Sequence, residues 1–447
     1  MLTGAFTPPS LRRLAEVVEY LVDPRVGIIG SVTEVRKEAG GPDFFHYGAE
    51  AANTLPMTGR ENFRVTGGAA TTRPGAVAKA IGEAIERYCS AWYVLDELPK
   101  TSYRAVPFVC VAPEEFALYR EEQYDKPGFA PARFTHDTTL RWTSATDLGT
   151  GECVYLPAAR VYMPYAFYAG ANDAPIVKPI STGLACHLSQ EETAIGAICE
   201  VVERDAVTIT WQAMLAPPRI RVETLPDELY DLVARFERPA GTVVMFDITL
   251  DHGVPTVLSV LLGPHAGAPA LVVAASASPS LPDATRKSLE ELAHTRRYAQ
   301  LIATHSARLS PDGPDHHSVQ GQRGHLNFWA DHRNLPLADF LFASAERVDY
   351  DDLPDPSTGD PTEDLHLLVE RITGVGERVL LVDLTTPDVG GLGFSVMRAV
   401  VPGLHPLQLG HRLRALGGRR LWTVPQKLGH PGISPSTGDN PAPHPYP

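Results

Sequence analysis

The sequence has little cysteine and no long apolar run. Its 447 residues include five cysteines, none in a Cys-x-x-Cys spacing, so we expect neither a structural zinc site nor a disulfide framework. No run of about 18 apolar residues occurs, so no membrane-spanning helix is predicted. Residues 1–10 lack the basic and then apolar pattern of a secretory signal peptide. The expected location is therefore the reducing cytoplasm, away from membranes.

Positive charge is also scarce. Lys and Arg together number 39 against 53 Asp and Glu, so a surface that binds nucleic acid is not expected. With 44% hydrophobic residues over this length, the chain can bury a large core, as one domain or as two fused lobes. Both properties are typical of a globular enzyme.

The two commonest nucleotide-binding loops are absent as well. No glycine-rich tract ends in Gly-Lys-Ser or Gly-Lys-Thr, and no dinucleotide-binding fingerprint is present. Any nucleotide must be held in another way.

What the sequence does contain is one five-residue pattern twice. Glu-x-x-Glu-Arg occurs at residues 83–87 and at residues 200–204, each time late in an Ala- and Ile-rich helical segment. Residues three apart share a helix face, so each cassette directs two carboxylates the same way. If the helices face each other, four carboxylates converge, and Mg²⁺, which commonly also holds phosphates, relieves their repulsion. The charged members are Glu83, Glu86, Arg87, Glu200, Glu203 and Arg204.

A plainer interpretation is that both cassettes are solvated helix surfaces. Each Glu and the Arg that follows it one turn later would then contribute only about 0.3 kcal/mol. The duplication and the flanking segments favour a site instead. Residues 65–75 predict a small-residue turn with Pro74 in the first turn of a helix, where backbone N–H groups bind anions. Ser189 and Glu192 form a capping box that opens the second helix.

Several segments match a known family in order along the chain. They are Gly67-Gly68-Ala69, the cassette regions 80–88 and 200–206, the segment 181–185 before the second cassette, a helical segment at 290–296, a strand and turn at 400–407, and the alternating prolines of 440–447. Together they resemble the YcaO proteins, and most closely the azoline-forming cyclodehydratase branch, which modifies ribosomally made peptides. The resemblance extends from about residue 60 to the last residue.

This resemblance implies a reaction and a set of residues. A Cys, Ser or Thr side chain attacks the preceding carbonyl, ATP phosphorylates the resulting oxygen, and phosphate leaves as the azoline forms. Lys79 stands where many members have Ser or Gln, and we expect it to reach a phosphate or to pair with Glu83. The implied Mg²⁺ ligands are Glu83, Glu86, Glu200 and Glu203. The implied nucleotide-binding residues are these four with Gly67, Gly68, Lys79, Arg87, Arg204 and Arg296, although surface pairing remains open for Arg296.

The proline-rich tail is implied to line the active site, with the carboxylate of Pro447 as a catalytic base. Alternating prolines hold such a segment extended at low entropic cost. Its polar composition predicts that residues 436–447 add little to a core, so that their deletion costs little stability. We also expect the deletion to affect cyclisation more than ATP binding.

The implied partners are a ribosomal precursor peptide and a second protein. The roughly 60 residues before the first motif are too few for a fused leader-binding domain, so a separate ThiF-like or winged-helix protein is expected to supply it. A homodimer is also possible.

Other functions remain open. The same activation of an amide by ATP can serve a sulfide, giving a thioamide, or an internal amine, giving a macroamidine. The chain could also be a non-catalytic scaffold that docks the precursor, or a carboxylate-bridged metallohydrolase that needs no nucleotide.

The pattern of elements predicts an α+β fold. The resemblance implies that this fold is of YcaO type, with the nucleotide site between two Glu-bearing helices. We expect these helices at about residues 74–93 and 189–213, and a third at about 283–305. The expected divisions are an N-terminal segment (1–60), the ATP-binding catalytic domain (61–430) and the tail (431–447). Asp205 is expected to tie down a neighbouring element, and Cys89 and Cys199 to be core residues.

Overall fold

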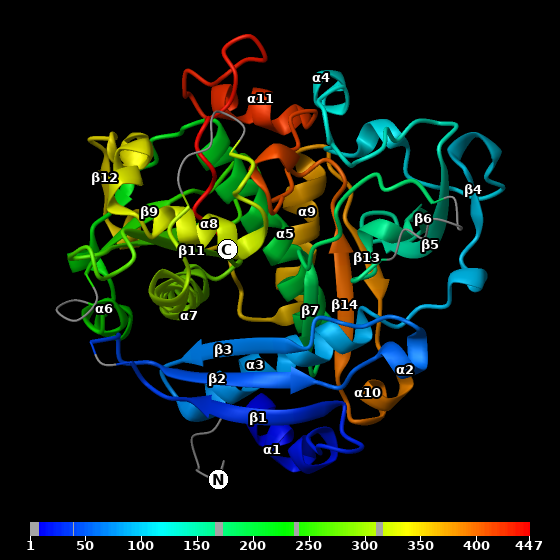
Figure 1. Ribbon diagram of the computed structural model, residues 1–447, viewed down its shortest axis with the longest axis horizontal. Coiled ribbons are helices and arrows are strands. Elements are labelled where there is room, and N and C mark those ends of the chain that lie inside the picture. The colour runs from blue at the N-terminus through cyan, green and yellow to red at the C-terminus, as the bar shows by residue number, and fades with distance from the viewer. Residues whose placement is uncertain (1–8, 39, 166–172, 237–240, 310–315) are drawn as a thin grey trace.

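Three sheets and the helices between them make up the computed structural model, which describes residues 9–38, 40–165, 173–236, 241–309 and 316–447. In Figure 1 the three-stranded sheet lies at the bottom, the six-stranded sheet at the right and the five-stranded sheet at the left. This mixture of helices and mainly antiparallel strands confirms the α+β prediction. Among the described residues, no helix is both long and apolar enough to cross a membrane.

The three-stranded sheet carries the first cassette helix. Its antiparallel strands are β1 (Ile29–Val35), β2 (Phe45–Ala51) and β3 (Val65–Ala70), and α3 (Arg73–Cys89) packs on β2 and β3. The helix α1 (Pro9–Leu21) packs on α3 in turn. Thr72 caps α3 by accepting a hydrogen bond from the Gly75 N–H at 3.2 Å, and Pro74 lies in the first turn as predicted.

The expected turn at residues 65–75 is wrong for its first half, because Val65–Ala70 is the strand β3. Its small residues serve a close approach to α3. A Cβ atom on Gly68 would lie 2.5 Å from the Lys79 Cβ, so only glycine lets the strand and the helix meet here.

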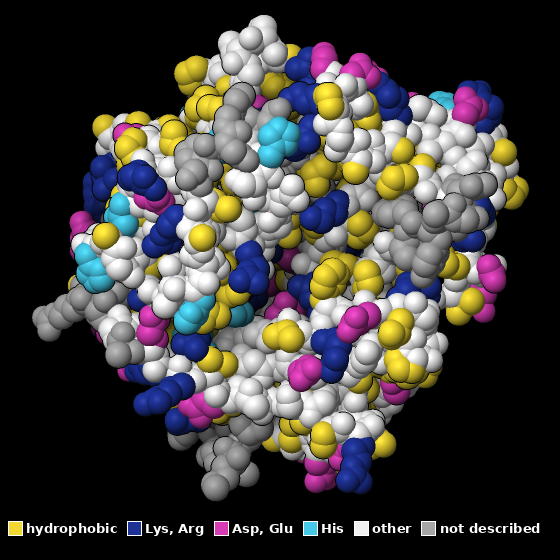
Figure 2. All heavy atoms as spheres, viewed as in Figure 1, with side chains coloured by type: hydrophobic (Ala, Val, Ile, Leu, Met, Phe, Trp, Pro, Cys, Tyr) yellow, Lys and Arg dark blue, Asp and Glu magenta, His cyan; other side chains and the backbone are white. Residues whose placement is uncertain are grey.

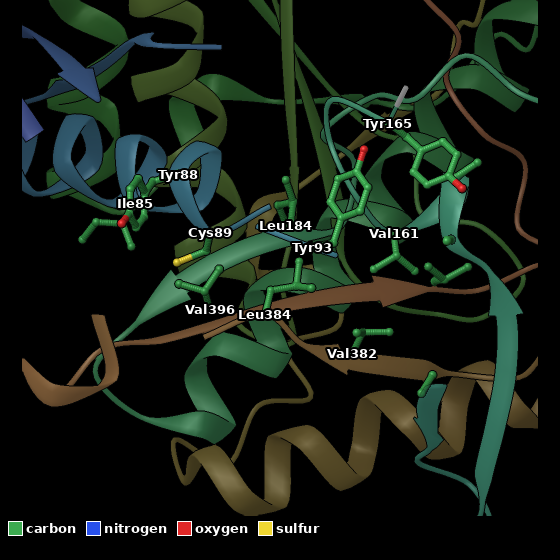
Figure 3. Close-up of a cluster of buried hydrophobic side chains, with 14 of the residues drawn as sticks. Ile85, Tyr88, Cys89, Tyr93, Val161, Tyr165, Leu184, Val382, Leu384 and Val396 are labelled. Atoms are coloured by element: carbon green, nitrogen blue, oxygen red, sulfur yellow. The ribbon is translucent and has the colours of Figure 1, made fainter. Parts of the chain in front are cut away.

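The six-stranded sheet has the order β4-β5-β13-β14-β7, with β6 paired to β5. Its strands are β4 (Lys100–Ser102), β5 (Thr139–Asp147), β6 (Cys153–Pro157), β7 (Leu184–His187), β13 (Leu380–Asp383) and β14 (Ser395–Val400). Figure 3 shows part of the core between α3 and this sheet, where buried Ile85 and Cys89 belong to the same cluster as Val382 and Val396. Burial of this face fixes α3 so that its glutamates point the other way.

The five-stranded sheet has the order β11-β10-β9-β8-β12, antiparallel except for the β8–β12 pair. Its strands are β8 (Arg219–Ile220), β9 (Thr242–Asp247), β10 (Thr256–Leu262), β11 (Leu271–Ala277) and β12 (Arg347–Val348). The long helix α7 (Leu281–His305) packs on β10 and β11 and also contacts β3. It therefore joins this sheet to the first one.

The second cassette helix, α5 (Gln190–Gln212), contacts both β14 of the six-stranded sheet and β11 of the five-stranded sheet. Ser189 caps it, accepting from the Glu192 N–H at 3.1 Å, which confirms the Ser189 half of the predicted capping box; the Glu192 carboxylate accepts from the Ser189 hydroxyl at 2.9 Å rather than from its backbone N–H. The remaining helices are α2 (Leu55–Thr58), α4 (Glu121–Tyr124), α6 (Asp227–Ala234), α8 (Gly321–Trp329), α9 (Pro361–Gly374), α10 (Pro387–Gly391) and α11 (Arg419–Lys427).

The tail is not the loosely attached segment that its composition predicts. Asn440, Ala442, His444 and Tyr446 are all buried, and in Figure 1 the C-terminus lies near the middle of the molecule beside α8. The indole N–H groups of Trp211 and Trp329 donate to tail carbonyls at 3.0 and 2.8 Å. The prediction that the tail adds little to the core is therefore wrong, since indole groups buried elsewhere in the fold complete their hydrogen bonds on its backbone.

Candidate functional site

The first cassette forms a clasp between α3 and β3. Glu83 accepts a hydrogen bond from Arg87 at 2.9 Å through Oε1 and one from the backbone N–H of Gly67 at 3.2 Å through Oε2. The N–H of Gly67, expected at the nucleotide, is therefore committed to a carboxylate here. A β-strand and the helix that follows it are tied together by one side chain.

The second cassette repeats this clasp. Glu200 accepts from Arg204 at 2.9 Å through Oε1 and from the backbone N–H of Gly183 at 2.9 Å through Oε2. Gly183 has φ of +86°, and a Cβ atom there would lie 2.3 Å from the carbonyl oxygen of Ala399. Only glycine fits at this point, at the start of β7.

The second glutamate of each cassette is in an environment that disfavours its charge. Burial raises the pKa of Glu86 well above its ordinary value, and the charges of Glu83 and Glu200 add to the effect. Burial likewise raises the pKa of Glu203 to about 7, and Glu200 and Glu291 contribute to that rise. Because Glu86 on α3 responds to Glu200 on α5, the two cassettes face each other as predicted.

The carboxylates do not form a ready-made metal centre. Among the described residues, no three acidic, His or Cys side chains come close enough together to hold an ion. Glu83 and Glu200 each have both oxygens engaged by glycine and arginine. The buried charges of Glu86 and Glu203 nevertheless suit a divalent cation, which would lower both pKa values and take carboxylate oxygens as ligands.

The tail reaches the second cassette through Tyr446. Its hydroxyl donates to Glu203 Oε1 at 2.5 Å, and its ring lies 4.6 Å from the guanidinium carbon of Arg204. Arg204 also pairs with Glu203 through the same Oε1. Because these interactions all use Oε1 of Glu203 or the face of Arg204, the other carboxylate oxygen of Glu203 is left for a further ligand.

Two carboxylates, Glu290 and Glu291, and one basic group, His294, come from α7 and lie against the first cassette. Lys79 pairs with Glu290 at 2.9 Å and with Glu291 at 3.3 Å, so in this structure its partners are not the expected Glu83. Glu291 has a lowered pKa, because Lys79 and His294 outweigh the effect of its burial. A Cβ atom on Gly67 would lie 2.9 Å from His294 Nε2, which brings the third helix against the first cassette.

Sequence reasoning missed Glu291 and His294 as members of the site. Both lie in the segment that resembles the third family helix, but only Arg296 was selected from it. The signal that could have found them is their spacing, since residues three apart share one helix face.

Arg296 lies away from these carboxylates, in a separate small pocket. It is 5% exposed and pairs with Glu38. The same pocket is lined by Lys37, His46 and Arg297. The structure thus gives Arg296 a carboxylate partner, and its contact with phosphate remains a prediction.

Figure 2 shows a hollow in the middle of this face of the molecule, with acidic side chains at its bottom and basic and hydrophobic ones around its edge. Three buried groups, Asp205, Cys89 and Cys199, are structural, as predicted. Asp205 is fully buried, pairs with Arg420 at 2.7 Å and accepts from the backbone N–H of His405 at 2.6 Å. Burial raises the pKa of Cys89 to about 11 and that of Cys199 to about 12, so neither thiol is poised as a nucleophile.

The structure is thus an α+β fold with a glutamate–glycine–arginine clasp on each of two helices. The family model described as YcaO cyclodehydratase, ATP- and Mg²⁺-binding, matches residues 67–405. The chain belongs to the YcaO family.

Solved structures share this fold. A heterocyclase in complex with substrate and cofactor has a TM-score of 0.80 and 20% identity, covering 98% of this chain and 57% of the heterocyclase chain. YcaO from Methanopyrus kandleri, bound with AMPPCP and Mg²⁺, has a TM-score of 0.64 and 23% identity over 88% of this chain and 90% of its own. The E. coli microcin synthetase McbBCD complex with pro-MccB17 bound has a TM-score of 0.56 and 16% identity over 83% of this chain and 87% of the matched chain. At these identities the likeness establishes the fold alone, and this chain spans little more than half the length of the first heterocyclase.

Proposed function

We propose that this chain is an ATP-dependent cyclodehydratase that converts Cys, Ser or Thr residues of a ribosomal precursor peptide to azolines. The observation that carries the proposal is the pair of matching clasps, one on α3 and one on α5, with the buried Glu86 and Glu203 beside them. The family match supports ATP and Mg²⁺ as the cofactors.

Glu83, Glu86, Glu200 and Glu203 would hold Mg²⁺, with Lys79, Arg87, Arg204, Gly67, Gly68 and Arg296 around the nucleotide. When bound, Mg²⁺ and ATP supply the phosphoryl group that turns a poor leaving group, the amide oxygen, into phosphate. The chain itself contributes positioning and charge balance. Arg87 and Arg204 keep the first glutamate of each cassette oriented, and Tyr446 does so for Glu203.

The tail would supply the base. The contact of Tyr446 with Glu203 supports a position for the next residue, Pro447, near the second cassette. We assign to the Pro447 carboxylate the removal of a proton from the reacting peptide. Anchoring of residues 440–446 in the core would hold that carboxylate in a fixed position.

The proposed partners are the precursor peptide and a separate leader-binding protein of ThiF-like or winged-helix type. The neighbour from E. coli is a multi-protein complex with its precursor bound, which supports this arrangement. Co-purification with the products of neighbouring genes tests it, and full activity of the lone chain on leader-bearing peptide would contradict it. The proposed compartment is the cytoplasm, in keeping with five free cysteines.

The decisive experiment incubates the chain and its partner with precursor peptide, ATP and Mg²⁺, and measures peptide mass and ADP together. Azoline formation predicts the loss of one water for each ring and one ADP for each water lost. Exchange of oxygen for sulfur in the peptide would identify a thioamide-forming enzyme. Loss of water with a new link between the peptide backbone and an amine of the same peptide would identify a macroamidine-forming enzyme. Absence of ATP consumption with bound peptide would favour a docking scaffold, and turnover without nucleotide a metallohydrolase.

A further inference from the structure

A basic pocket adjoins the second cassette on the side away from Glu203. It opens to solvent, and its empty space is about 500 Å³ with the open mouth included. Four cationic side chains line it, and its lining, within the described part of the chain, contains no carboxylate. The four are Arg160, Lys178, Arg204 and Arg398.

Of the four cationic side chains, Arg398 is the one whose burial needs an explanation. It lies in β14, is 6% exposed, and donates through Nη2 to the carbonyl of Ile180 at 2.8 Å. Its Nε and Nη1 are buried, and neither has a hydrogen-bond partner among the described residues. Burial, together with the charges of Arg160 and Arg87, lowers the pKa of Arg398 to about 9 against the opposing charges of Glu200 and Glu86. A buried, incompletely bonded cation is costly unless an anion joins it.

The other cations leave the pocket positive. Arg160 has no ion pair among the described residues, and its guanidinium lies 5.7 Å from the ring of Phe116. Lys178 is exposed and makes one long contact, 3.5 Å, to the carbonyl of Leu409. Arg204 alone is committed to carboxylates, those of Glu200 and Glu203. Two or more positive charges are therefore available to a ligand.

The pocket lies between the cassette and the segment that anchors the tail. Gln408 lines it, and the carbonyl of Gln408 is 3.0 Å from the ring nitrogen Nε2 of His444. A ligand in the pocket would thus be next to both the proposed metal site and the proposed base.

We infer that this pocket binds a phosphate-type oxyanion at a subsite separate from the carboxylates, and that it receives the phosphate leaving the substrate. This second part rests on the proposed function. There the C–O bond of the phosphorylated intermediate breaks, the electron pair stays on the phosphate oxygen, and the nitrogen loses its proton to the base as the C=N bond forms. Arg398 and Arg160 then hold the dianion that departs.

The test uses the full chain without ATP or peptide, so that it does not depend on the proposed reaction. Thermal unfolding is followed with increasing inorganic phosphate and, at equal ionic strength, chloride. We expect phosphate to raise the Tm of the wild type and the apparent affinity to fall about tenfold in Arg398→Met, the size of effect that one lost charge-assisted contact gives. Arg398→Met alone should keep or raise the Tm, because it removes a buried charge with a single hydrogen bond.

Arg371→Met is the matched control, since Arg371 also donates to one backbone carbonyl, that of Gly253, and does not line the pocket. It should lower the Tm and keep the phosphate response. If Arg398→Met fails to fold, the same phosphate titration is carried out on Arg160→Gln, which removes another charge from this pocket. An unchanged phosphate response in both pocket variants, or none in the wild type, would overturn the inference.

Two further arms identify the source of the anion. A phosphate response that persists with saturating Mg²⁺ and ADP supports a site for released phosphate. A response abolished by AMPPCP and Mg²⁺ supports the same oxyanion site occupied by the terminal phosphate of the nucleotide. Equal stabilisation by acetate would mean that the pocket accepts a peptide carboxylate, and would overturn the assignment to phosphate.

Discussion

The two cassettes share one local design and differ in what supports it. In each, the first glutamate joins an arginine one turn later and the N–H of a glycine in the strand or turn before the helix. The distances differ by no more than 0.3 Å between the two copies, at 3.2 and 2.9 Å to glycine. This shared part needs only residues that are close in sequence.

The second glutamates of the two cassettes, Glu86 and Glu203, are held by different kinds of contact. Glu86 depends on its own helix and on the backbone near Cys186 of β7. Glu203 is bound by Tyr446, a residue 243 positions away, whose ring also covers Arg204. The comparison teaches that the same five-residue pattern can be supported by a sheet strand in one place and by the C-terminal tail in the other.

The strongest way to separate the two cassettes is to delete Tyr446 and Pro447. We expect cyclisation to fall about 100-fold or more, because the base and the orientation of Glu203 are lost together. Nucleotide affinity, measured by titration calorimetry with Mg²⁺ and AMPPCP, should fall as well, because Glu203 loses the contact with Tyr446. A short tag at the C-terminus should act like the deletion, and the same tag at the N-terminus should be harmless. Native rates of cyclisation with a C-terminal tag would rule out the role of the tail.

Glu83→Gln and Glu203→Gln test whether both cassettes bind the metal and nucleotide. Each should lower the affinity for Mg²⁺ and nucleotide, or the turnover, by about tenfold or more, as loss of a ligand charge does. Glu370→Gln on the exposed face of α9 is the control, and should change the free energy of unfolding by less than about 0.5 kcal/mol. Unchanged ATP consumption in both cassette variants would show that the cassettes are solvated helix surfaces rather than a metal and nucleotide site.

Lowering the pH should weaken the anchoring of the tail, which supports the second cassette and not the first. His325 is fully buried, donates to the carbonyl of His444 at 2.7 Å and accepts from the N–H of Gly410 at 3.1 Å, which requires the neutral ring. Burial holds the pKa of His325 well below its ordinary value of 6.5. Below that value the unfolded chain binds a proton that the folded chain refuses, so stability falls by up to about 1.4 kcal/mol for each pH unit until the folded pKa is reached.

Glu203 titrates in the opposite sense, because its pKa is raised to about 7 from 4.5 and stability from this group is gained as pH falls. The difference in denaturant midpoint between the wild type and His325→Gln, followed from pH 7 to pH 5, isolates the histidine. Parallel curves for the two proteins would show that His325 does not carry the pH dependence.

The smallest expected effect comes from removing one hydroxyl in each cassette region. Tyr446→Phe breaks the bond to Glu203, and Tyr88→Phe breaks a bond of 2.8 Å to Asp388. Each should cost about 1 kcal/mol of stability. Only Tyr446→Phe should weaken Mg²⁺-dependent nucleotide binding, by about fivefold, and raise the pH at which half of that binding is lost, because the hydroxyl lowers the pKa of Glu203. Equal effects of both variants on nucleotide binding would contradict a positioning role for Tyr446.

Features set by local sequence were predictable. The cassette helices were expected at about 74–93 and 189–213 and occupy Arg73–Cys89 and Gln190–Gln212. Apolar periodicity and the caps at Thr72 and Ser189 define both helices within a few residues. Asp205 was predicted to be structural because a charge on the apolar side of a helix needs a partner.

Features set by distant partners were not predictable. Residues 65–70 have the composition of a turn, and they form a strand because β2 pairs with them and because α3 needs a surface without side chains. The tail has the composition of a solvated segment, and it is buried because Trp211 and Trp329 use its carbonyls. Arg398 gave no signal in the sequence, since an arginine in a strand looks the same whether its charge is compensated or not.

The burial of residues 440–446 gives the synthesis of this protein an order. These residues leave the ribosome after every element that they contact, including α5, α8 and β11. Until then, the indole N–H groups of Trp211 and Trp329 lack the carbonyls to which they donate in the folded protein. Two of these contacts, Trp211 with Ala442 and Glu203 with Tyr446, join residues more than 200 positions apart, and such contacts form slowly because a long loop must be ordered first. A chain that terminates before residue 440 would keep both glutamate helices and still lack the contacts that complete α5, so the second cassette is finished only after residues 440–446 have been made.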